Sequence, residues 1–210
     1  GLALARMLFF TGIIPQVFVV RFSDKMSRDC EMNFNRLKEE TETPMYDIFS
    51  EDDFPLINDE DIVVDAIFGS GLNRNIEGFA AELIKHLNDN NAIRIAIDIP
   101  SGLWESHQVS ESPSHQVETQ SLRDVESQSQ QVETHQLHHE NTQYVIDTSK
   151  KYISQPQIFK ADYTLSFQFP KIAFMFPEND AFVGRWEVLD IGLHKDFIDN
   201  VETLNFYTTE

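Results

Sequence analysis

The sequence predicts a doubly wound, three-layer α/β/α fold with a mostly parallel sheet, and three observations support this prediction. Two short apolar runs, 62–68 and 95–99, each carry one carboxylate near their ends and are followed by small-residue turns. Such β-branched runs are typical of strands that are buried on both faces of a parallel sheet. Between them, the apolar residues at 79, 83, 84 and 87 share one helical face. Residues 62–99 are therefore predicted to form one strand–helix–strand unit.

The segments before this unit predict further helices and strands in alternation. Residues 2–10 are strong helix formers and apolar on nearly all sides, which predicts a buried helix ended by Gly12. Residues 16–22 predict a strand, and Ser27 is suited to cap a helix that runs to about residue 40. Residues 43–49 are a weaker candidate strand. The alternation is that of an α/β protein.

The composition changes after residue 104. Residues 105–157 are rich in Ser, Gln, Glu and His, contain near-repeats and lack apolar periodicity, so we predict a disordered, low-complexity insertion within a single domain that spans 1–210. Its histidines could bind a metal adventitiously, but an expanded surface loop is the favoured interpretation. Residues 144–153 are a candidate short element. Strands are predicted again at 160–167 and 184–192, separated by a loop or irregular strand at 169–177.

The bulk composition narrows the classes of function. The chain has 210 residues, 41% hydrophobic and 24% charged, which is a globular composition. Its net charge of −19 argues against a nucleic-acid backbone or an anionic membrane as partner. One cysteine excludes an internal disulfide and fits a cytoplasmic location. Gly12 and Pro15 interrupt the apolar stretch 7–20, which is too short to span a bilayer.

The candidate site lies where the two central strands end. Asp65 and Asp98 should meet at the carboxyl edge of the sheet, beside Ser101 and the turn Gly69–Gly71, because parallel strands end at the same edge. The pattern leaves three interpretations open: a hard-cation site of oxygen ligands, a site for ribose hydroxyls, or aspartates that only cap loops. The Gly-x-Gly turn alone is a weak dinucleotide signal, and the nucleophile-elbow pattern is absent.

Several separate motifs follow one another along the chain: VDAIFGSGL at 64–72, AIDIPSGL at 96–103, KADYTLSF at 160–167, Pro170-Lys171, Val183-Gly184 and VLDIG at 188–192. In order and spacing, these motifs resemble the NAD(P)H-hydrate epimerase family, whose domain is the YjeF N-terminal domain. The similarity covers residues 1–104 and 158–205, and the sequence most resembles the epimerase half of bacterial bifunctional NAD(P)H-hydrate repair enzymes.

This resemblance implies a Rossmann-like fold, a homodimer and a function in nicotinamide cofactor repair. The family interconverts the R and S forms of hydrated NADH and NADPH (NADHX and NADPHX), and a dehydratase then restores the S form. By match of motif, Asp65 and Ser101 would bind a potassium ion. The residues that would contact the substrate are Gly69, Ser70, Gly71, Leu72, Asn73, Arg74, Asn75 and Asp98. Asp98 and Lys171 are candidates for proton transfer, although a lysine after a proline in a loop is more often exposed.

The sequence departs from the family at its ends and in the insertion. Gly1 matches the last glycine of the family's Asn-Asn-Gly-Gly-Asp-Gly loop, which supplies a potassium ligand and phosphate contacts, so we expect a chain that is incomplete at its amino-terminal end. It stops near Tyr207, where a bifunctional protein would continue into a dehydratase domain. Two alternatives to an epimerase therefore stand: a non-catalytic module for binding or dimerisation, and an inactive truncated copy.

Overall fold

The computed structural model describes residues 1–23, 25–104 and 157–202, and within them it contains six strands and five α-helices. The predicted insertion lies outside the described residues except for Gln157, as does the candidate element at 144–153. The strands are β1 (Val17–Val20), β2 (Met45–Ile48), β3 (Ile62–Asp65), β4 (Ile93–Ile97), β5 (Tyr163–Phe167) and β6 (Arg185–Leu189). The α-helices are α1 (Leu2–Phe10), α2 (Arg28–Glu40), α3 (Phe79–Asn88), α4 (Asp180–Val183) and α5 (Lys195–Asn200). Short 3₁₀ turns are η1 (Glu51–Asp53), η2 (Ile172–Met175) and η3 (Pro177–Asn179).

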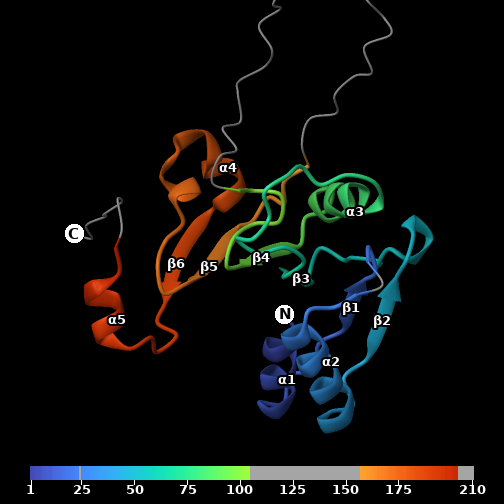
Figure 1. Ribbon diagram of the computed structural model, residues 1–210. Coiled ribbons are helices and arrows are strands. Elements are labelled where there is room, and N and C mark those ends of the chain that lie inside the picture. The colour runs from blue at the N-terminus through green and yellow to red at the C-terminus, as the bar shows by residue number, and fades with distance from the viewer. Residues whose placement is uncertain (24, 105–156, 203–210) are drawn as a thin grey trace, which may run out of the picture. The chain divides into compact units, whose positions relative to one another are not determined.

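Every pairing between these strands is parallel, which confirms the predicted α/β class (Figure 1). The hydrogen bonds divide the strands into two sheets, a four-stranded one in the order β3-β4-β5-β6 and a two-stranded one of β1 and β2. The prediction treated all six strands as one doubly wound sheet. Within the described residues, side-chain packing rather than a backbone ladder connects the two sheets.

Helix α3 provides that packing. Its residues Leu83, Ile84 and Leu87 are buried and Phe79 is partly buried, so the predicted apolar face is confirmed. The same cluster contains Ile48 of β2, together with residues of β3, β4 and the chain before β5. Burial of large aliphatic side chains contributes about 1.5–3 kcal/mol each. The predicted strand–helix–strand unit over 62–99 is thus the central part of the core.

The sequence-based predictions were confirmed for the start of helix α2 but were wrong about the burial of helix α1. Helix α2 begins as predicted, because the Ser27 hydroxyl accepts a hydrogen bond from the Cys30 amide at 3.3 Å. The prediction that α1 is buried was wrong: Ala5 is its one buried residue, whereas Met7 and Phe10 are 64% and 65% exposed. Helix α1 packs mainly on α2, so only one of its sides is covered.

The chain between β5 and β6 folds into short helical turns instead of the predicted loop or irregular strand. Ala173 and Phe174 of η2 are buried in a second core with Ile99 and Val183. Gly184 then turns into β6 with a φ of 59°, and a Cβ there would collide with the Ala161 carbonyl oxygen. Helix α5 was not predicted, and none of its residues is buried.

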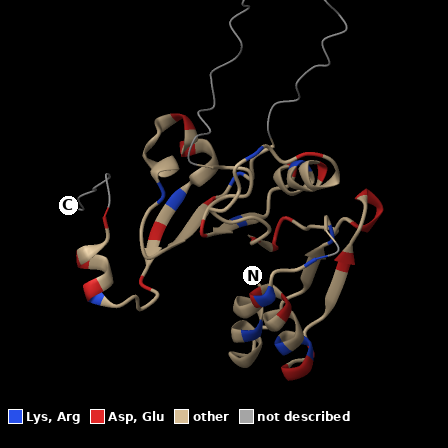
Figure 2. Ribbon diagram, in the orientation of Figure 1, with Lys and Arg blue, Asp and Glu red and all other residues tan. Residues whose placement is uncertain are grey.

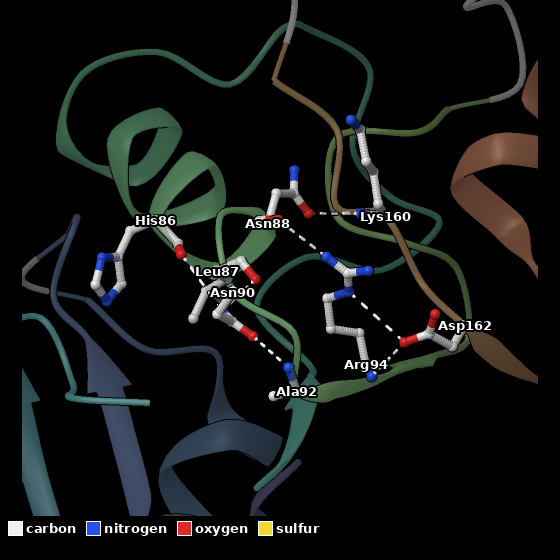
Figure 3. A network of polar contacts seen from close by, with 8 residues as sticks. All are labelled: His86, Leu87, Asn88, Asn90, Ala92, Arg94, Lys160 and Asp162. Atoms are coloured by element: carbon white, nitrogen blue, oxygen red, sulfur yellow. Dashed lines mark hydrogen bonds and ion pairs between the residues drawn. The ribbon is translucent and has the colours of Figure 1, made fainter. Parts of the chain in front are cut away.

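A network of polar contacts joins the amino ends of β4 and β5 to the end of α3 (Figure 3). The Asn88 side chain donates to the Ile158 carbonyl at 2.9 Å and accepts from the Lys160 amide at 2.8 Å. Arg94 donates to the Asn88 carbonyl at 3.0 Å, and its amide donates to the Asp162 carboxylate at 2.8 Å. These contacts fix the chain where it returns to the sheet, at the edge opposite to the strand ends that carry Asp65 and Asp98.

Charged residues are spread over many elements of the described chain (Figure 2). The acidic run Glu51–Asp53 forms the exposed turn η1, in which the Asp53 carboxylate accepts from the amides of Phe49 and Ser50. The carboxylate of Asp53 therefore caps a local turn. No helix among the described residues is long and apolar enough to cross a membrane.

Candidate functional site

The carboxyl ends of β3 and β4 are joined by the side chains of Asp65 and Ser101. The Ser101 hydroxyl donates to Oδ1 of Asp65 at 2.6 Å, and its amide donates to Oδ2 at 2.7 Å. The hydroxyl also accepts from the Phe68 amide at 3.0 Å. Asp65 is 1% exposed and Ser101 is 0% exposed, so these hydrogen bonds form without competition from water. The structure therefore brings together the two residues that the sequence assigned to one edge.

Burial raises the pKa of Asp65 above its ordinary value, although hydrogen bonds from Ser101 and Ile67 act in the opposite direction. Among the described residues, no lysine or arginine side chain forms an ion pair with this carboxylate. A buried carboxylate without a cationic side chain is a position where a bound cation would lower the electrostatic cost.

The oxygen atoms around Asp65 fit a hard cation of low charge. The Ser101 hydroxyl lies 3.4 Å from the Phe68 carbonyl, so carboxylate, hydroxyl and carbonyl oxygens are gathered in one place. The described part of the chain has no group of three or more His, Cys, Asp and Glu side chains that could hold a metal ion. This set of donors suits an alkali cation better than a transition metal, which prefers several imidazole or thiolate ligands.

The turn after β3 presents the residues that the sequence assigned to the substrate. It begins with a hydrogen bond of 3.2 Å from the Leu72 amide to the Gly69 carbonyl. Leu72 is partly buried and packs against the core of α3, which anchors the turn. The other members of this predicted set are exposed, and they are Gly69, Ser70, Gly71, Asn73, Arg74 and Asn75. The turn thus offers backbone amides and polar side chains to solvent at the strand ends.

Asp98 follows β4 and connects this turn to Lys171. Its Oδ2 accepts from the Ser70 amide at 3.3 Å, and its Oδ1 lies 2.8 Å from Nζ of Lys171. Burial, the largest influence, raises the pKa of Asp98, but the hydrogen bond and charge of Lys171 and the contacts of Ser70 outweigh it. The net result is a pKa below the ordinary value, so Asp98 is ionised at neutral pH.

The placement of Lys171 corrects the expectation that this lysine is exposed. The Lys171 side chain is 17% exposed, as is that of Asp98. The sequence pattern did not predict this ion pair, because Lys171 follows β5 and comes close to Asp98, at the end of β4, only through the turn after β5. Two residues other than glycine have a positive φ in the described chain, Asp98 at 73° and Gln168 at 61°, and both follow the ends of neighbouring strands. Neither conformation has a signal in the sequence.

The amino end of α1 reaches the same edge. A Cβ built on Gly1 would lie 2.9 Å from Cβ of Ala66, the residue that follows β3. The first backbone amides of a helix have no partner within the helix, and its dipole favours negative charge there. A second close approach lies at Gly102, where φ is 94° and a Cβ would collide with the Gln157 carbonyl oxygen. Only glycine fits there, beside the ends of the segment 105–156.

The fold and the strand-end site define a parallel α/β protein whose ligand would bind at the carboxyl edge of β3 and β4. A model of the family described as YjeF-related protein N-terminus matches residues 1–173, and the chain belongs to this family.

The chain is also similar to several curated proteins. An NAD(P)H-hydrate epimerase of Anaerococcus prevotii is 35% identical over 107 residues, which cover 49% of each chain. One of Roseobacter litoralis is 32% identical over 118 residues, covering 50% of this chain and 52% of the relative. A bifunctional NAD(P)H-hydrate repair enzyme of Thermofilum pendens is 32% identical over 107 residues, 49% of this chain and 20% of the relative. The chain thus spans about half the length of the epimerases it matches.

Proposed function

We propose that this chain interconverts the R and S forms of NADHX and NADPHX in the repair of nicotinamide cofactors. The observation that carries the proposal is the convergence of Asp65, Ser101 and Asp98 beside the turn 69–75, at one edge of a parallel sheet. Membership of the YjeF-related family and the names of the similar epimerases support the same activity.

The exposed part of the site suits a dinucleotide with a polar, hydroxylated ring. In the proposal, the turn 69–75 contacts the substrate through its backbone amides and polar side chains. The amino end of α1, beside Ala66, offers unpaired amides to the phosphates. The ionised carboxylate of Asp98 accepts a hydrogen bond from a substrate hydroxyl, which is a strong interaction because the acceptor is charged.

A potassium ion is the proposed cofactor, with Asp65 and Ser101 as its ligands. The cation would compensate the negative charge of the buried Asp65 carboxylate, and it would also offset negative charge of the phosphates of the substrate. We further propose a homodimer located in the cytoplasm, with a dehydratase as the functional partner. The name of the bifunctional relative supports that partner.

The decisive experiment measures R-to-S epimerisation of NADHX, coupled to an added S-specific dehydratase, with and without potassium. It uses this chain, its Asp98→Asn variant, and a Glu187→Gln variant as the control, because Glu187 is exposed on β6. We expect activity that requires potassium, a loss of at least about tenfold in Asp98→Asn, and no change in Glu187→Gln.

A second protein, in which an Asn-Asn-Gly-Gly-Asp-Gly loop replaces Gly1, separates two causes of failure. Activity only in this second protein would support the reaction and assign the loss to an incomplete site. Absence of activity in both folded proteins would favour the non-catalytic module or the inactive copy.

A further inference from the structure

Lys171 and Asp98 form an ion pair that is shielded from water. Both side chains are 17% exposed, whereas the acidic partners in the pairs Arg6–Glu40 and Arg21–Asp47 are 42% and 45% exposed. Exposed pairs of that kind contribute about 0–1 kcal/mol, since water and salt screen them. The Lys171–Asp98 pair lies next to the open turn but is itself shielded, so water and salt screen the attraction between its two charges less.

The chain on the lysine side of the pair is held rigidly. The Phe174 amide donates to the Lys171 carbonyl at 3.0 Å, and the side chain of Phe174 is buried in the core beside Ile99. Upstream, the Ser166 hydroxyl donates to the Phe169 carbonyl at 2.9 Å and closes the turn after β5. Lys171 therefore projects from a backbone that is fixed on both sides.

The chain on the aspartate side is also fixed, in an unusual conformation. Asp98 has a φ of 73°, and its amide donates to the Leu165 carbonyl of β5 at 2.8 Å. Its two carboxylate oxygens then have separate partners, Oδ1 with Lys171 and Oδ2 with the Ser70 amide. Backbone conformations of this kind concentrate at functional sites, where the surrounding structure maintains them.

We propose that Lys171 is a positioning residue for Asp98, which it keeps ionised and orients so that Oδ2 faces the turn 69–71. This inference rests on the proposed function, because it assigns Lys171 a part in substrate binding through Asp98. Lys171 itself occupies the Oδ1 side of the carboxylate, which leaves the Oδ2 side for the turn and for the substrate hydroxyl.

The electrostatic argument gives the direction of the effect. The groups that act on the Asp98 carboxylate are the Lys171 ammonium and the contacts of Ser70, and they overcome the burial that raises its pKa. When the charge of Lys171 is removed, burial dominates and the pKa of Asp98 rises. On acidification, Asp98 in such a variant therefore becomes protonated at a higher pH than in the wild type. A neighbouring cation typically lowers a carboxyl pKa by about 1–3 units, so a rise of about one unit or more is expected.

The first test does not depend on epimerase activity. The carboxyl ¹³C shift of Asp98 is followed by NMR against pH in the labelled chain and in Lys171→Met, Lys171→Gln and Lys171→Arg, with Asp98→Asn used to assign the signal. The control is Lys85→Met, since Lys85 lies exposed on α3. We expect the midpoint to rise by about one unit in the Met and Gln variants and to return towards wild type in the Arg variant. An unchanged midpoint in the folded Met or Gln variant overturns the proposal.

The second test measures the pH profile of kcat/KM for NADHX epimerisation. We expect the acidic limb to move to higher pH in Lys171→Gln, by about as much as the midpoint of the Asp98 titration, and to return in Lys171→Arg. A purely structural role would lower kcat/KM equally at every pH and would leave the limb in place, which would also overturn the proposal. Inactivity of both this chain and the protein with the restored loop would contradict the proposed function, and the NMR titration would still decide the role of Lys171.

Discussion

Replacement of Ser101 by alanine should destabilise the protein through the loss of the two hydrogen bonds made by its buried hydroxyl group. The hydroxyl donates to the Asp65 carboxylate at 2.6 Å and accepts from the Phe68 amide at 3.0 Å. A hydrogen bond to a charged group contributes about 1.5–3 kcal/mol, and a donor left without a partner costs about 1–3 kcal/mol. Because the amide of residue 101 still donates to Asp65, we expect the lower part of the combined range, about 2.5–4 kcal/mol.

The measurement is urea unfolding at pH 7, followed by circular dichroism, with Ser166→Ala as the matched control. Ser166 is also buried, but its hydroxyl donates to a neutral carbonyl, so its loss should cost about 1 kcal/mol. Burial raises the pKa of Asp65, which means that its ionised form is the less stable one in the fold. The stability associated with Asp65 is therefore lost as pH rises through its folded pKa, and the cost of Ser101→Ala should be greater above that pKa, where the carboxyl group is ionised, than below it. A cost below that of Ser166→Ala would refute the assigned role of the charged hydrogen bond.

Three other changes probe the fold and the site. Asn88→Ala should lower the free energy of unfolding in urea by about 1–3 kcal/mol, because it removes both side-chain hydrogen bonds to the chain that enters β5 (Figure 3). The control is Asn91→Ala, since Asn91 is exposed, and equal losses in the two variants would contradict the assigned role of Asn88. Asp65→Asn should weaken the potassium dependence of epimerisation by at least about tenfold, since it removes a charged ligand; an unchanged potassium response in the folded variant would exclude Asp65 as a ligand. Replacement of 105–156 by a linker of about six residues should leave the fold intact and raise stability by up to about 2 kcal/mol, because each halving of a loop lowers its closure cost by about 0.6 kcal/mol. A loss of more than about 2 kcal/mol would show that the segment contributes to the core.

The sequence by itself determined the order and type of most elements. Helix α3, which has strong periodicity, buries the face that its apolar spacing predicts. The apolar run of β3 was predicted to be buried on both faces, but Ile62 and Val64 are 62% and 40% exposed. The serine cap at Ser27 also formed as predicted, because a cap depends on residues a few positions apart. The meeting of Asp65 with Ser101 followed from one topological rule, that parallel strands end at the same edge.

Tertiary structure alone decided features that depend on contacts between distant segments. The division of the strands into two sheets and the exposure of α1 depend on which elements cover each surface, and local spacing does not encode that. The shielded pair of Lys171 with Asp98 depends on the left-handed backbone at Asp98 and on the turn after β5. The sequence therefore predicted which side chains meet at the candidate site, whereas their direction and charge state depend on the packing of the chain around them.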